Sequence, residues 1–295
     1  MARATVHIHW PPVDFEKWQA LGNDYVILEA DDLPFELTSP RIRAICAAHT
    51  GVSADGILLL SKPEHDGYVA RLRVFNPDGS EAELSGNGAR EAVLYLRRNR
   101  WTDAESFAIQ TKAGDIHPRV ISETECVLDM GRARLRSADY PSGDADGRGE
   151  LTAGGRTWRF QHVQVGNPQC AISVQDEAEL SRLGLDAIGP EIEHHELFPN
   201  RTNVSWFAVR GPGRIRARIF ERGVGETQAS GTGATGAAVA YVVDGGQSPV
   251  TVVLDGGELE VEVGGDLQIR LSGWAVPVYR GTLAETFLEE LHATK

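Results

Sequence analysis

Apolar and polar residues alternate along many short stretches of the chain, which is the pattern of strands that bury one face. Leu72 and Val74, for example, alternate with Arg71 and Arg73. On this basis strands are predicted at 15–30 (interrupted at 22–24), 57–60, 69–75, 107–111, 115–120, 125–130, 162–165, 170–174, 204–210, 215–220, 250–254, 258–263, 267–271 and 276–279.

Helical spacing of apolar residues extends furthest over 87–98 and 232–243, and both stretches follow a Ser-Gly-x-Gly turn. Shorter helices are predicted at 178–188, 190–195, 283–292 and 40–49, the last with Ser39 as N-cap and Pro40 at the first helical position. The stretch 137–155 is rich in Gly, Asp and Ser and is predicted to be a loop or linker between two halves. Many short strands with a central helix in each half predict two α+β domains.

The two halves are related by an internal repeat. The segment from Phe75 to Ala89 aligns without gaps on the segment from Phe220 to Ala234, with Ser-Gly-x-Gly-Ala at the end of both. Gly22-Asn23 precedes the first serine at nearly the spacing at which Gly166-Asn167 precedes the second. Such landmarks in the same order indicate two copies of one unit of roughly 120–140 residues. We therefore predict an N-terminal domain at 1–135, completed by 276–295, and a C-terminal domain at 136–275.

Composition narrows the classes of partner. A net charge of −13, from 29 basic and 42 acidic residues, argues against nucleic acid and anionic membranes as partners. No apolar stretch approaches 18 residues, and the start (1–10) lacks the apolar core of a signal peptide. Cys46, Cys126 and Cys170 are odd in number and widely spaced, which favours reduced thiols in a cytoplasmic protein.

The Ser-Gly-x-Gly turns place Ser85 and Ser230 at helix N-termini, where free backbone N–H groups and the helix dipole attract anions. A single such turn is explained equally well by an N-cap serine and turn-forming glycines. Two matched copies favour a carboxylate or phosphate held between them. No His/Cys/Asp spacing suits a metal, and no Gly-x-Ser-x-Gly elbow is present, so we expect neither a metal site nor nucleophilic hydrolysis.

Several asparagines lie in turns flanked by Gly or Pro, where their amides often bond locally but together are able to bind a zwitterion. These are Asn23, Asn76, Asn87, Asn167 and Asn203. The Glu221-Arg222 pair directly follows a strand, nine and eight residues before Ser230, and is therefore either a surface pair or part of the same site.

Here the sequence resembles a known family. Segments 21–25 (Leu-Gly-Asn-Asp-Tyr), 51–55 (Gly-Val-Ser-Ala-Asp), 75–81 (Phe-Asn-Pro-Asp-Gly-Ser-Glu), 85–90 (Ser-Gly-Asn-Gly-Ala-Arg), 166–168 (Gly-Asn-Pro), 221–227 (Glu-Arg-Gly-Val-Gly-Glu-Thr) and 230–233 (Ser-Gly-Thr-Gly) are similar to those of diaminopimelate epimerase. The resemblance runs from about Phe15 to Tyr279. It implies a PLP-independent epimerase without cofactors, with two pseudo-symmetric domains, each a barrel-like mixed sheet around a central helix. The site would lie in the inter-domain cleft.

The resemblance also implies which residues form the site. Substrate contacts are expected from Asn23, Asn76, Gly86, Asn87, Asn167, Asn203, Glu221, Arg222, Gly231 and Thr232. Ser85, Ser230, Glu221 and Gln169 are the expected catalytic positions. The implied partner is a small carboxylate or amino-acid substrate, and a homodimer is a further expectation.

The chain departs from the family at the residues that matter most. Ser85 and Ser230 stand where the family has two cysteines that act as base and acid on opposite faces of the α-carbon. A serine hydroxyl is far less acidic than a thiol, whose ordinary pKa is near 8.5. Gln169 replaces the histidine expected after Gly-Asn-Pro, and Gly56 stands where a substrate-binding glutamine is expected.

Four interpretations follow from these departures. The chain is a Cys-to-Ser form of an ordinary diaminopimelate epimerase of lysine biosynthesis, or a relative acting on a different carboxylate with hydroxyl acid/base groups. Alternatively it has lost proton transfer and performs a rearrangement or cyclisation driven by positioning, or it is a non-catalytic binder. Because Gln169 and Gly56 also differ, we favour the isomerase with an altered substrate.

Overall fold

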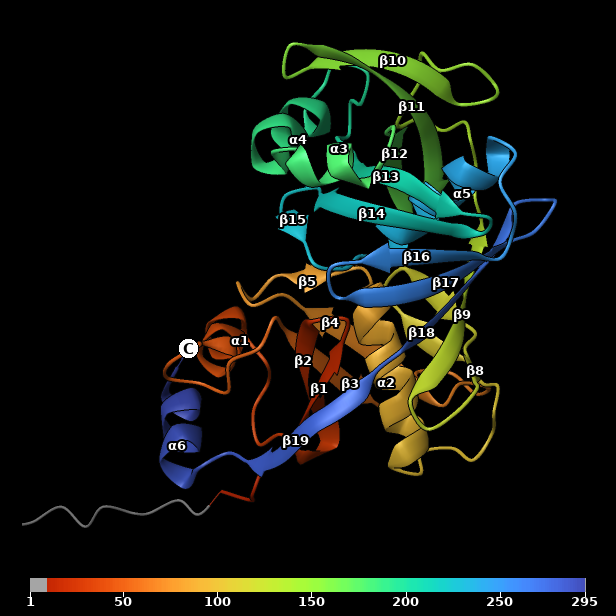
Figure 1. Cartoon of the computed structure of the whole chain (residues 1–295). Coiled ribbons are helices and arrows are strands. Elements are labelled where there is room, and N and C mark those ends of the chain that lie inside the picture. The colour runs from red at the N-terminus through yellow and green to blue at the C-terminus, as the bar shows by residue number, and fades with distance from the viewer. Residues whose placement is uncertain (1–9, 295) are drawn as a thin grey trace, which may run out of the picture.

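The computed structural model describes residues 10–294, and the predicted leader up to His9 lies outside that range. The described residues form two mixed sheets, one in each of two domains that are stacked on one another (Figure 1). Each domain packs a long helix against its sheet, α2 (Gly86–Arg98) in the N-terminal domain and α5 (Gly231–Val243) in the C-terminal domain. The predicted fold class, α+β with two related domains, is confirmed.

The N-terminal sheet has the strand order β19-β1-β2-β3-β4-β6-β7, with β5 paired to β4. Its strands are β1 (Asp14–Ala20), β2 (Asn23–Glu29), β3 (Ile57–Ser61), β4 (Ala70–Phe75), β5 (Glu81–Ala82), β6 (Ile109–Thr111), β7 (Gly114–Ile116) and β19 (Val276–Thr282). The parallel pairings, β2 with β3 and β4 with β6, are each connected through a helix, α1 (Ser39–Cys46) and α2.

The C-terminal sheet has the order β10-β11-β12-β13-β14-β16-β17-β18-β9-β8, with β15 paired to β14. Its strands are β8 (Arg119–Val120), β9 (Glu125–Arg132), β10 (Arg148–Ala153), β11 (Arg156–Val165), β12 (Asn167–Ser173), β13 (Asn203–Gly211), β14 (Arg214–Glu221), β15 (Gly225–Thr227), β16 (Val250–Leu254), β17 (Gly257–Val263) and β18 (Gln268–Trp274). The repeat is visible in the topology, because β14, β15, α5 and β16 reproduce the order β4, β5, α2 and β6.

The two central helices are both buried but pack with side chains of different size. In α2 the apolar face is made of large residues, among them Val93, Leu94 and Leu96, which pack in the core of the first sheet. In α5 the buried residues are mostly Gly and Ala, so the strands approach that helix closely. Both arrangements remove the helix from water, and the burial of apolar area stabilises both domains.

Two strands connect the domains. β19 follows the C-terminal sheet in sequence but pairs antiparallel with β1 of the N-terminal sheet. In the other direction, β9 pairs with β18 of the C-terminal sheet, while Cys126 and Leu128 on β9 pack in the N-terminal core. The chain therefore crosses the junction twice, and the domain limits at 135 and 276 stay a prediction.

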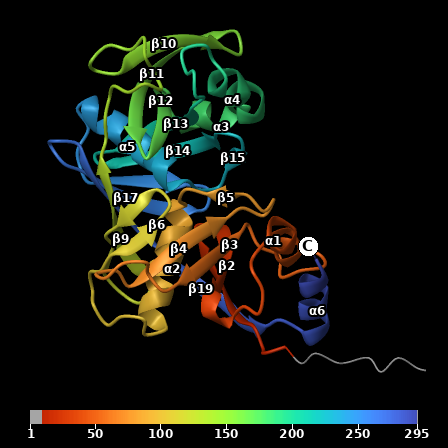
Figure 2. The same ribbon diagram turned by 180° about the vertical axis from the view of Figure 1, so that it is seen from behind.

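Shorter helices cover the outside of both domains. They are α1, α3 (Glu177–Arg182), α4 (Leu185–Glu193), α6 (Glu285–Ala293) and the 3-10 turn η1 (Ala30–Asp32). Figures 1 and 2 both show α6 beside α1, where Arg41 donates to the carbonyl of Leu291 at 2.7 Å. No helix among residues 10–294 is long and apolar enough to cross a membrane.

Three local predictions are wrong. The stretch 137–155 is not a loop throughout, because β10 lies within it and pairs with β11. Alternating Leu151 and Ala153 are buried there, a pattern that the surrounding Gly and Asp residues concealed. The N-cap of α1 is Thr38 rather than Ser39. Pro190 lies inside α4 and does not start a helix, because α4 already begins at Leu185.

Candidate active site at the domain junction

The site begins with the N-termini of the two central helices, which meet at the junction. Ser85 is the N-cap of α2, and its Oγ accepts a hydrogen bond from the Gly88 N–H at 3.1 Å. Ser230 is the N-cap of α5 and accepts from the Gly233 N–H at 3.2 Å. A Cβ placed on Gly86 would lie 3.5 Å from the Cα of Gly231, so the first residues of the two helices are in contact. Two positive helix ends therefore face the same point.

Ser230 belongs to a hydrogen-bonded group with Glu221. The serine donates from Oγ to Glu221 Oε2 at 2.9 Å, and Thr227 donates to the other carboxylate oxygen at 2.8 Å. Burial raises the pKa of Glu221, and this effect outweighs the lowering by the two hydroxyl donors. A carboxylate with a raised pKa beside a serine is a stronger base than an ordinary glutamate and is placed to take the serine proton.

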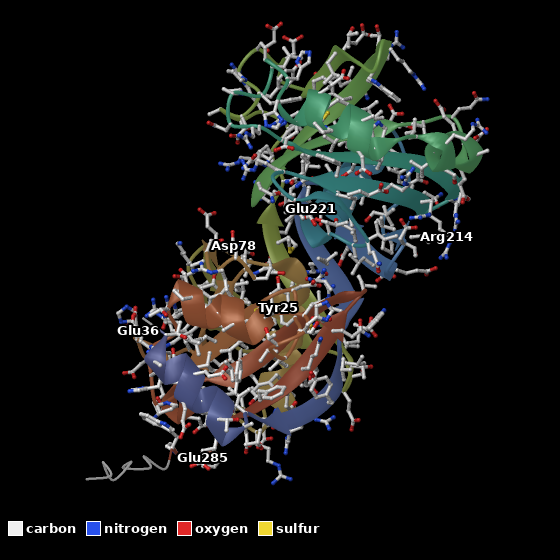
Figure 3. The ribbon with its side chains drawn as sticks, turned by 90° about the vertical axis from the view of Figure 1, so that its left-hand side faces the viewer. Tyr25, Glu36, Asp78, Arg214, Glu221 and Glu285 are labelled. Atoms are coloured by element: carbon white, nitrogen blue, oxygen red, sulfur yellow. The ribbon has the colours of Figure 1, made fainter. Side chains whose placement is uncertain are left out.

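Ser85 lies near Tyr25 on β2, and its effect is to lower the pKa of Tyr25, by less than burial raises it. Tyr25 is buried in the core of the N-terminal domain. Burial raises the pKa of Tyr25 above that of a free phenol, so it stays protonated at neutral pH. Figure 3 labels Tyr25 in the N-terminal domain and Glu221 in the C-terminal domain, on the two sides of the junction.

A chain of amides and charges supports the N-terminal side. Asn23 Nδ2 donates to Asp55 at 2.9 Å, and Asn87 Nδ2 donates to Asn23 Oδ1 at 3.3 Å. Arg90 is completely buried and donates to Asn87 Oδ1 at 2.6 Å and to the Gly86 carbonyl at 3.1 Å. Its guanidinium thus lies directly behind the helix N-terminus, where it adds positive charge close to the junction.

Glu91, next to Arg90, is a buried carboxyl group whose oxygens have no hydrogen-bond partner among residues 10–294. Burial raises the pKa of Glu91 well above its ordinary range, against the smaller lowering effect of the Arg90 charge. Sequence reasoning missed Tyr25, Arg90 and Glu91 as site residues, although the first two lie inside quoted motifs. Charged residues inside an otherwise apolar helix were the signal available.

The C-terminal asparagines are held by neighbouring polar groups. Gln169 is fully buried and donates from Nε2 to Asn167 Oδ1, which fixes the orientation of that amide. Asn203 donates to the Pro168 carbonyl at 3.2 Å and accepts from the Arg222 backbone N–H at 2.8 Å. Asn203 therefore joins two of the predicted substrate-binding segments, and both ends of its side-chain amide are hydrogen-bonded.

The remaining predicted residues lie at the rim. Thr232 lies in the first turn of α5. A Cβ placed on Gly166, before β12, would lie 4.0 Å from Thr232 Cγ2, which is van der Waals contact. Arg222 Nη1 donates to the Asn200 carbonyl at 2.9 Å. Asn76 lies in the turn after β4, where it donates to Ser80 Oγ at 3.0 Å. Within the described residues, neither the Asn76 nor the Arg222 side chain is hydrogen-bonded to Ser85 or Ser230.

Packing fills the space at Gly56, where the resemblance predicts a substrate-binding glutamine. A Cβ on Gly56 would lie 2.3 Å from the carbonyl oxygen of Phe75 and 2.6 Å from the ring of Tyr25. The Tyr25 ring therefore fills the space beside Gly56, and a larger residue there would displace it.

Two concavities of about 290 Å³ each lie elsewhere on the molecule. One is lined by residues of β19 together with Glu16 and Arg98, and the other by Glu29, Lys62, Trp101 and their neighbours. Neither includes Ser85 or Ser230. Within the described residues, no group of three or more His, Cys, Asp or Glu is arranged to hold a metal ion.

Comparison with known proteins identifies the family. The family model "Diaminopimelate epimerase" matches residues 15–136 and 161–276. The chain is 39% identical over 282 residues to a diaminopimelate epimerase from Synechococcus sp. (strain JA-3-3Ab), covering 92% of this chain and 99% of that protein. It is also 39% identical over 273 residues to the enzyme from Magnetococcus marinus, covering 91% of this chain and 96% of the relative.

Among solved structures the fold is similar to a hydroxyproline epimerase from Agrobacterium vitis, with a TM-score of 0.66, 12% identity and coverage of 94% of both chains. It is also similar to a phenazine biosynthesis protein of the PhzF family from Bacillus anthracis, with a TM-score of 0.65, 17% identity and coverage of 92% and 99%. At these identities the likeness concerns the fold alone. The family match and the 39% identity over nearly the whole chain show that this protein belongs to the diaminopimelate epimerase family of PLP-independent epimerases.

Proposed function

We propose that the protein is an isomerase that moves the hydrogen on the α-carbon of a small carboxylate or amino-acid substrate, using Ser85 and Ser230 on opposite faces. The observation that carries this proposal is the meeting of the two serine-capped helix N-termini at Gly86 and Gly231. A substrate carboxylate bound there receives backbone N–H groups and positive helix ends from both domains. Arg90 behind the junction adds to the attraction.

The C-terminal side is suited to remove a proton. Ser230 Oγ takes the α-proton while its own proton passes to the Glu221 carboxylate, to which it is already hydrogen-bonded at 2.9 Å. The C–H bond breaks, the electron pair stays on the α-carbon, and Glu221 becomes a neutral acid. The raised pKa of Glu221 lowers the free-energy cost of this transfer.

The N-terminal side is suited to return a proton to the opposite face. Ser85 gives its hydroxyl proton to the carbanion, and the charge left on Oγ is stabilised by the Gly88 N–H and the α2 N-terminus. The protein thus has an acid and a base in positions where symmetric enzymes of this kind place two like groups.

A substrate other than diaminopimelate is favoured by the closed space at Gly56. Because the Tyr25 ring and the Phe75 carbonyl fill that position, the glutamine expected there has no room without other changes. A Cys-to-Ser form of an ordinary enzyme would not require this difference. Glu221 bonded to Ser230 favours proton transfer over a rearrangement driven by positioning or over simple binding.

The test is hydrogen exchange in D2O with purified protein and a panel of amino and hydroxy acids that includes the diaminopimelate isomers. We expect deuterium at the α-carbon of the true substrate, and faster exchange than inversion for the isomer whose hydrogen faces Ser230. Turnover without deuterium would instead indicate a rearrangement, and tight binding without either would indicate a binder.

The Ser85→Cys/Ser230→Cys double variant distinguishes two interpretations: a Cys-to-Ser form of diaminopimelate epimerase, and an isomerase with an altered substrate. If the substrate pocket is altered, restoring both thiols gives little diaminopimelate epimerisation, because Gln169 and Gly56 are unchanged. Epimerisation at a rate typical of the family would show that the serines are the functional difference, and the proposal of an altered substrate would be withdrawn.

The proposal also covers the oligomeric state of the protein and its cellular compartment. β19 is an edge strand with exposed apolar side chains, Val278 at 53% and Tyr279 at 43%, which suits pairing with a second copy. Sedimentation measurements should therefore show a homodimer.

The three cysteines are buried and form no disulfide within the described residues, which supports a reducing, cytoplasmic compartment.

A further inference from the structure

The turn between β14 and β15 carries Arg222 and directly follows Glu221. Its next three residues are Gly-Val-Gly, so none of them has a polar side chain that could brace it. Gly223 and Gly225 have positive φ angles of 76° and 108°, and Val224 at the tip is 75% exposed. Because glycine leaves the backbone unusually free, such a turn needs contacts from other segments to keep one conformation.

The equivalent turn of the N-terminal half is braced by its own side chains. Asp78 accepts hydrogen bonds from the Ser80 N–H at 2.8 Å and from Ser80 Oγ at 2.7 Å. Pro77 fixes a φ angle in the same turn. The repeat places Arg222 and Gly223 at the positions of Pro77 and Asp78, so the C-terminal copy lacks both devices.

The C-terminal turn is instead held by the connection from α4 to β13. Asn203 Oδ1 accepts from the Arg222 N–H at 2.8 Å, and Glu193 Oε1, at the end of α4, accepts from the Gly223 N–H at 3.0 Å. These two N–H groups belong to the peptide units on either side of the Arg222 Cα. Fixing both units sets the direction in which the Arg222 side chain leaves the backbone.

Glu193 is a buried carboxylate, 4% exposed. Burying a charge is costly unless partners offset the loss of water, and here the partners are the Gly223 N–H and Arg201 Nη1, which lies 3.5 Å from Oε1. A charged acceptor bonds an N–H group more strongly than a neutral amide does. Glu193 is therefore the stronger of the two anchors beside Arg222.

The Arg222 guanidinium retains donors for a ligand. Within the described residues its side chain makes one hydrogen bond, from Nη1 to the Asn200 carbonyl at 2.9 Å, and the residue is exposed. A guanidinium has five N–H donors in a planar fork, so several stay available. Because Glu221, its neighbour in the chain, is bonded to Ser230, Arg222 lies at the rim of the junction.

We propose that Glu193 is a positioning residue: together with Asn203 it holds the backbone around Arg222, so that the guanidinium stays at the rim and binds an acceptor group of the substrate. The inference rests on the proposed function in one respect, that a small carboxylate or amino-acid substrate binds at the junction with Arg222 as a contact. Glu193 touches no substrate and takes part in no bond-breaking step. Its loss therefore acts on binding and leaves proton transfer in place.

The first test needs no substrate. Hydrogen–deuterium exchange of backbone N–H groups, read by mass spectrometry of peptic fragments that span the turn, reports how firmly the turn is held. Glu193→Leu should make this exchange about tenfold faster, because a charge-assisted hydrogen bond to the Gly223 N–H is lost. Glu193→Gln keeps an acceptor oxygen and should stay within about threefold of wild type.

Glu191→Leu is the matched control. Glu191 lies on the same helix, and its Oε2 accepts from the Gly154 N–H at 2.7 Å, in the turn between β10 and β11. This change should speed exchange around Gly154 and leave the Arg222 turn as it is in wild type. Unchanged exchange of the Arg222 turn in Glu193→Leu, or equal acceleration there by Glu191→Leu, would overturn the inference.

The second test uses the substrate found by exchange in D2O. In Glu193→Leu, KM should rise about tenfold while kcat stays within about twofold of wild type, because a binding contact is lost and the proton-transfer groups remain. Glu193→Gln should recover most of the affinity. A fall in kcat at unchanged KM indicates a purely structural role and contradicts the inference.

A double variant shows whether Glu193 acts through Arg222. Arg222→Met alone should raise KM, and Glu193→Leu added to it should raise KM no further, since the contact that Glu193 positions is already gone. Effects that multiply independently would assign Glu193 another role and sink the inference. If wild-type protein turns over no substrate, the proposed function fails, and exchange of the turn still decides whether Glu193 holds Arg222.

Discussion

The two halves of this protein share a backbone plan and differ in chemistry. Ser85 and Ser230 cap their helices with nearly equal bonds, 3.1 Å to Gly88 and 3.2 Å to Gly233. The residue after the repeated phenylalanine is Asn76 in one half and Glu221 in the other, at equivalent positions of the repeat. The backbone therefore offers helix N-terminal N–H groups in both halves, while a carboxylate is hydrogen-bonded to Ser230 in one half only of the described residues.

The equivalent helices also differ inside. Arg90 and Thr235 occupy the same position, and each bonds to a carbonyl one turn earlier, Gly86 at 3.1 Å and Gly231 at 2.8 Å. The next position holds Glu91 in α2 and Gly236 in α5. Gly236 lets β12 pack closely, since a Cβ there would lie 2.8 Å from that of Gln169. The N-terminal half thus buries charge where the C-terminal half packs small residues.

This contrast shows how a repeated fold can acquire two unlike proton-transfer groups. Backbone N–H groups at a helix end depend little on side-chain identity, so they survive divergence. The pKa of the groups beside each serine depends on single residues. Under the proposed function, one different residue beside each serine makes one side a base and the other an acid.

The largest expected effect comes from removing the base. Glu221→Gln should reduce substrate exchange about 10²- to 10⁴-fold, the usual contribution of a general base. In the wild type the rate should rise with pH through the raised pKa of Glu221, and the variant should lose that limb of the profile. Glu226→Gln is the control, because Glu226 is a nearby glutamate on β15 bonded to Arg218. An unchanged pH profile in Glu221→Gln would assign the base elsewhere.

Arg90 and Thr235 test the difference between the helix interiors. Arg90→Met should lower the free energy of unfolding by about 3–5 kcal/mol, because the Gly86 carbonyl and Asn87 Oδ1 lose a buried donor. Thr235→Val removes a single bond and should cost about 1 kcal/mol. Urea denaturation measures both, and equal costs would show that the buried charge has no special role at the junction.

The last prediction concerns the pH dependence of stability through Glu91. The unfolded chain releases this proton near pH 4.5, whereas the folded protein holds it to higher pH. The free energy of unfolding therefore falls as pH rises above 4.5, by about 1.4 kcal/mol per pH unit until the folded pKa is reached. Glu91→Gln should remove this loss, matching wild type at pH 4 and exceeding it at pH 7.

Thermal unfolding across pH 4–8 checks the Glu91 prediction. Glu83, an exposed glutamate two residues before Ser85, provides the control. Glu83→Gln should leave the pH dependence of stability unchanged. A parallel shift of both variants at every pH would contradict the assignment to Glu91.

The sequence by itself determined the repeat, the two central helices, the serine caps and the family. Periodicity, Ser-Gly-x-Gly turns and the spacing of Asn23 and Asn167 are local features, and local features are readable without coordinates. The strand β10 within 148–153 was missed, because its alternation is short and is surrounded by turn residues.

Tertiary structure alone decided which residues lie around Ser85. Tyr25 and Ser85 are 60 positions apart, and only the packing of β2 against α2 brings Tyr25 near Ser85. The raised pKa values of Glu221 and Glu91 likewise depend on burial, which is a property of the assembled core. The same holds for β9 and β19, whose pairings across the junction join segments distant in sequence. Sequence specifies the groups that are available, and the three-dimensional contacts set their protonation and partners.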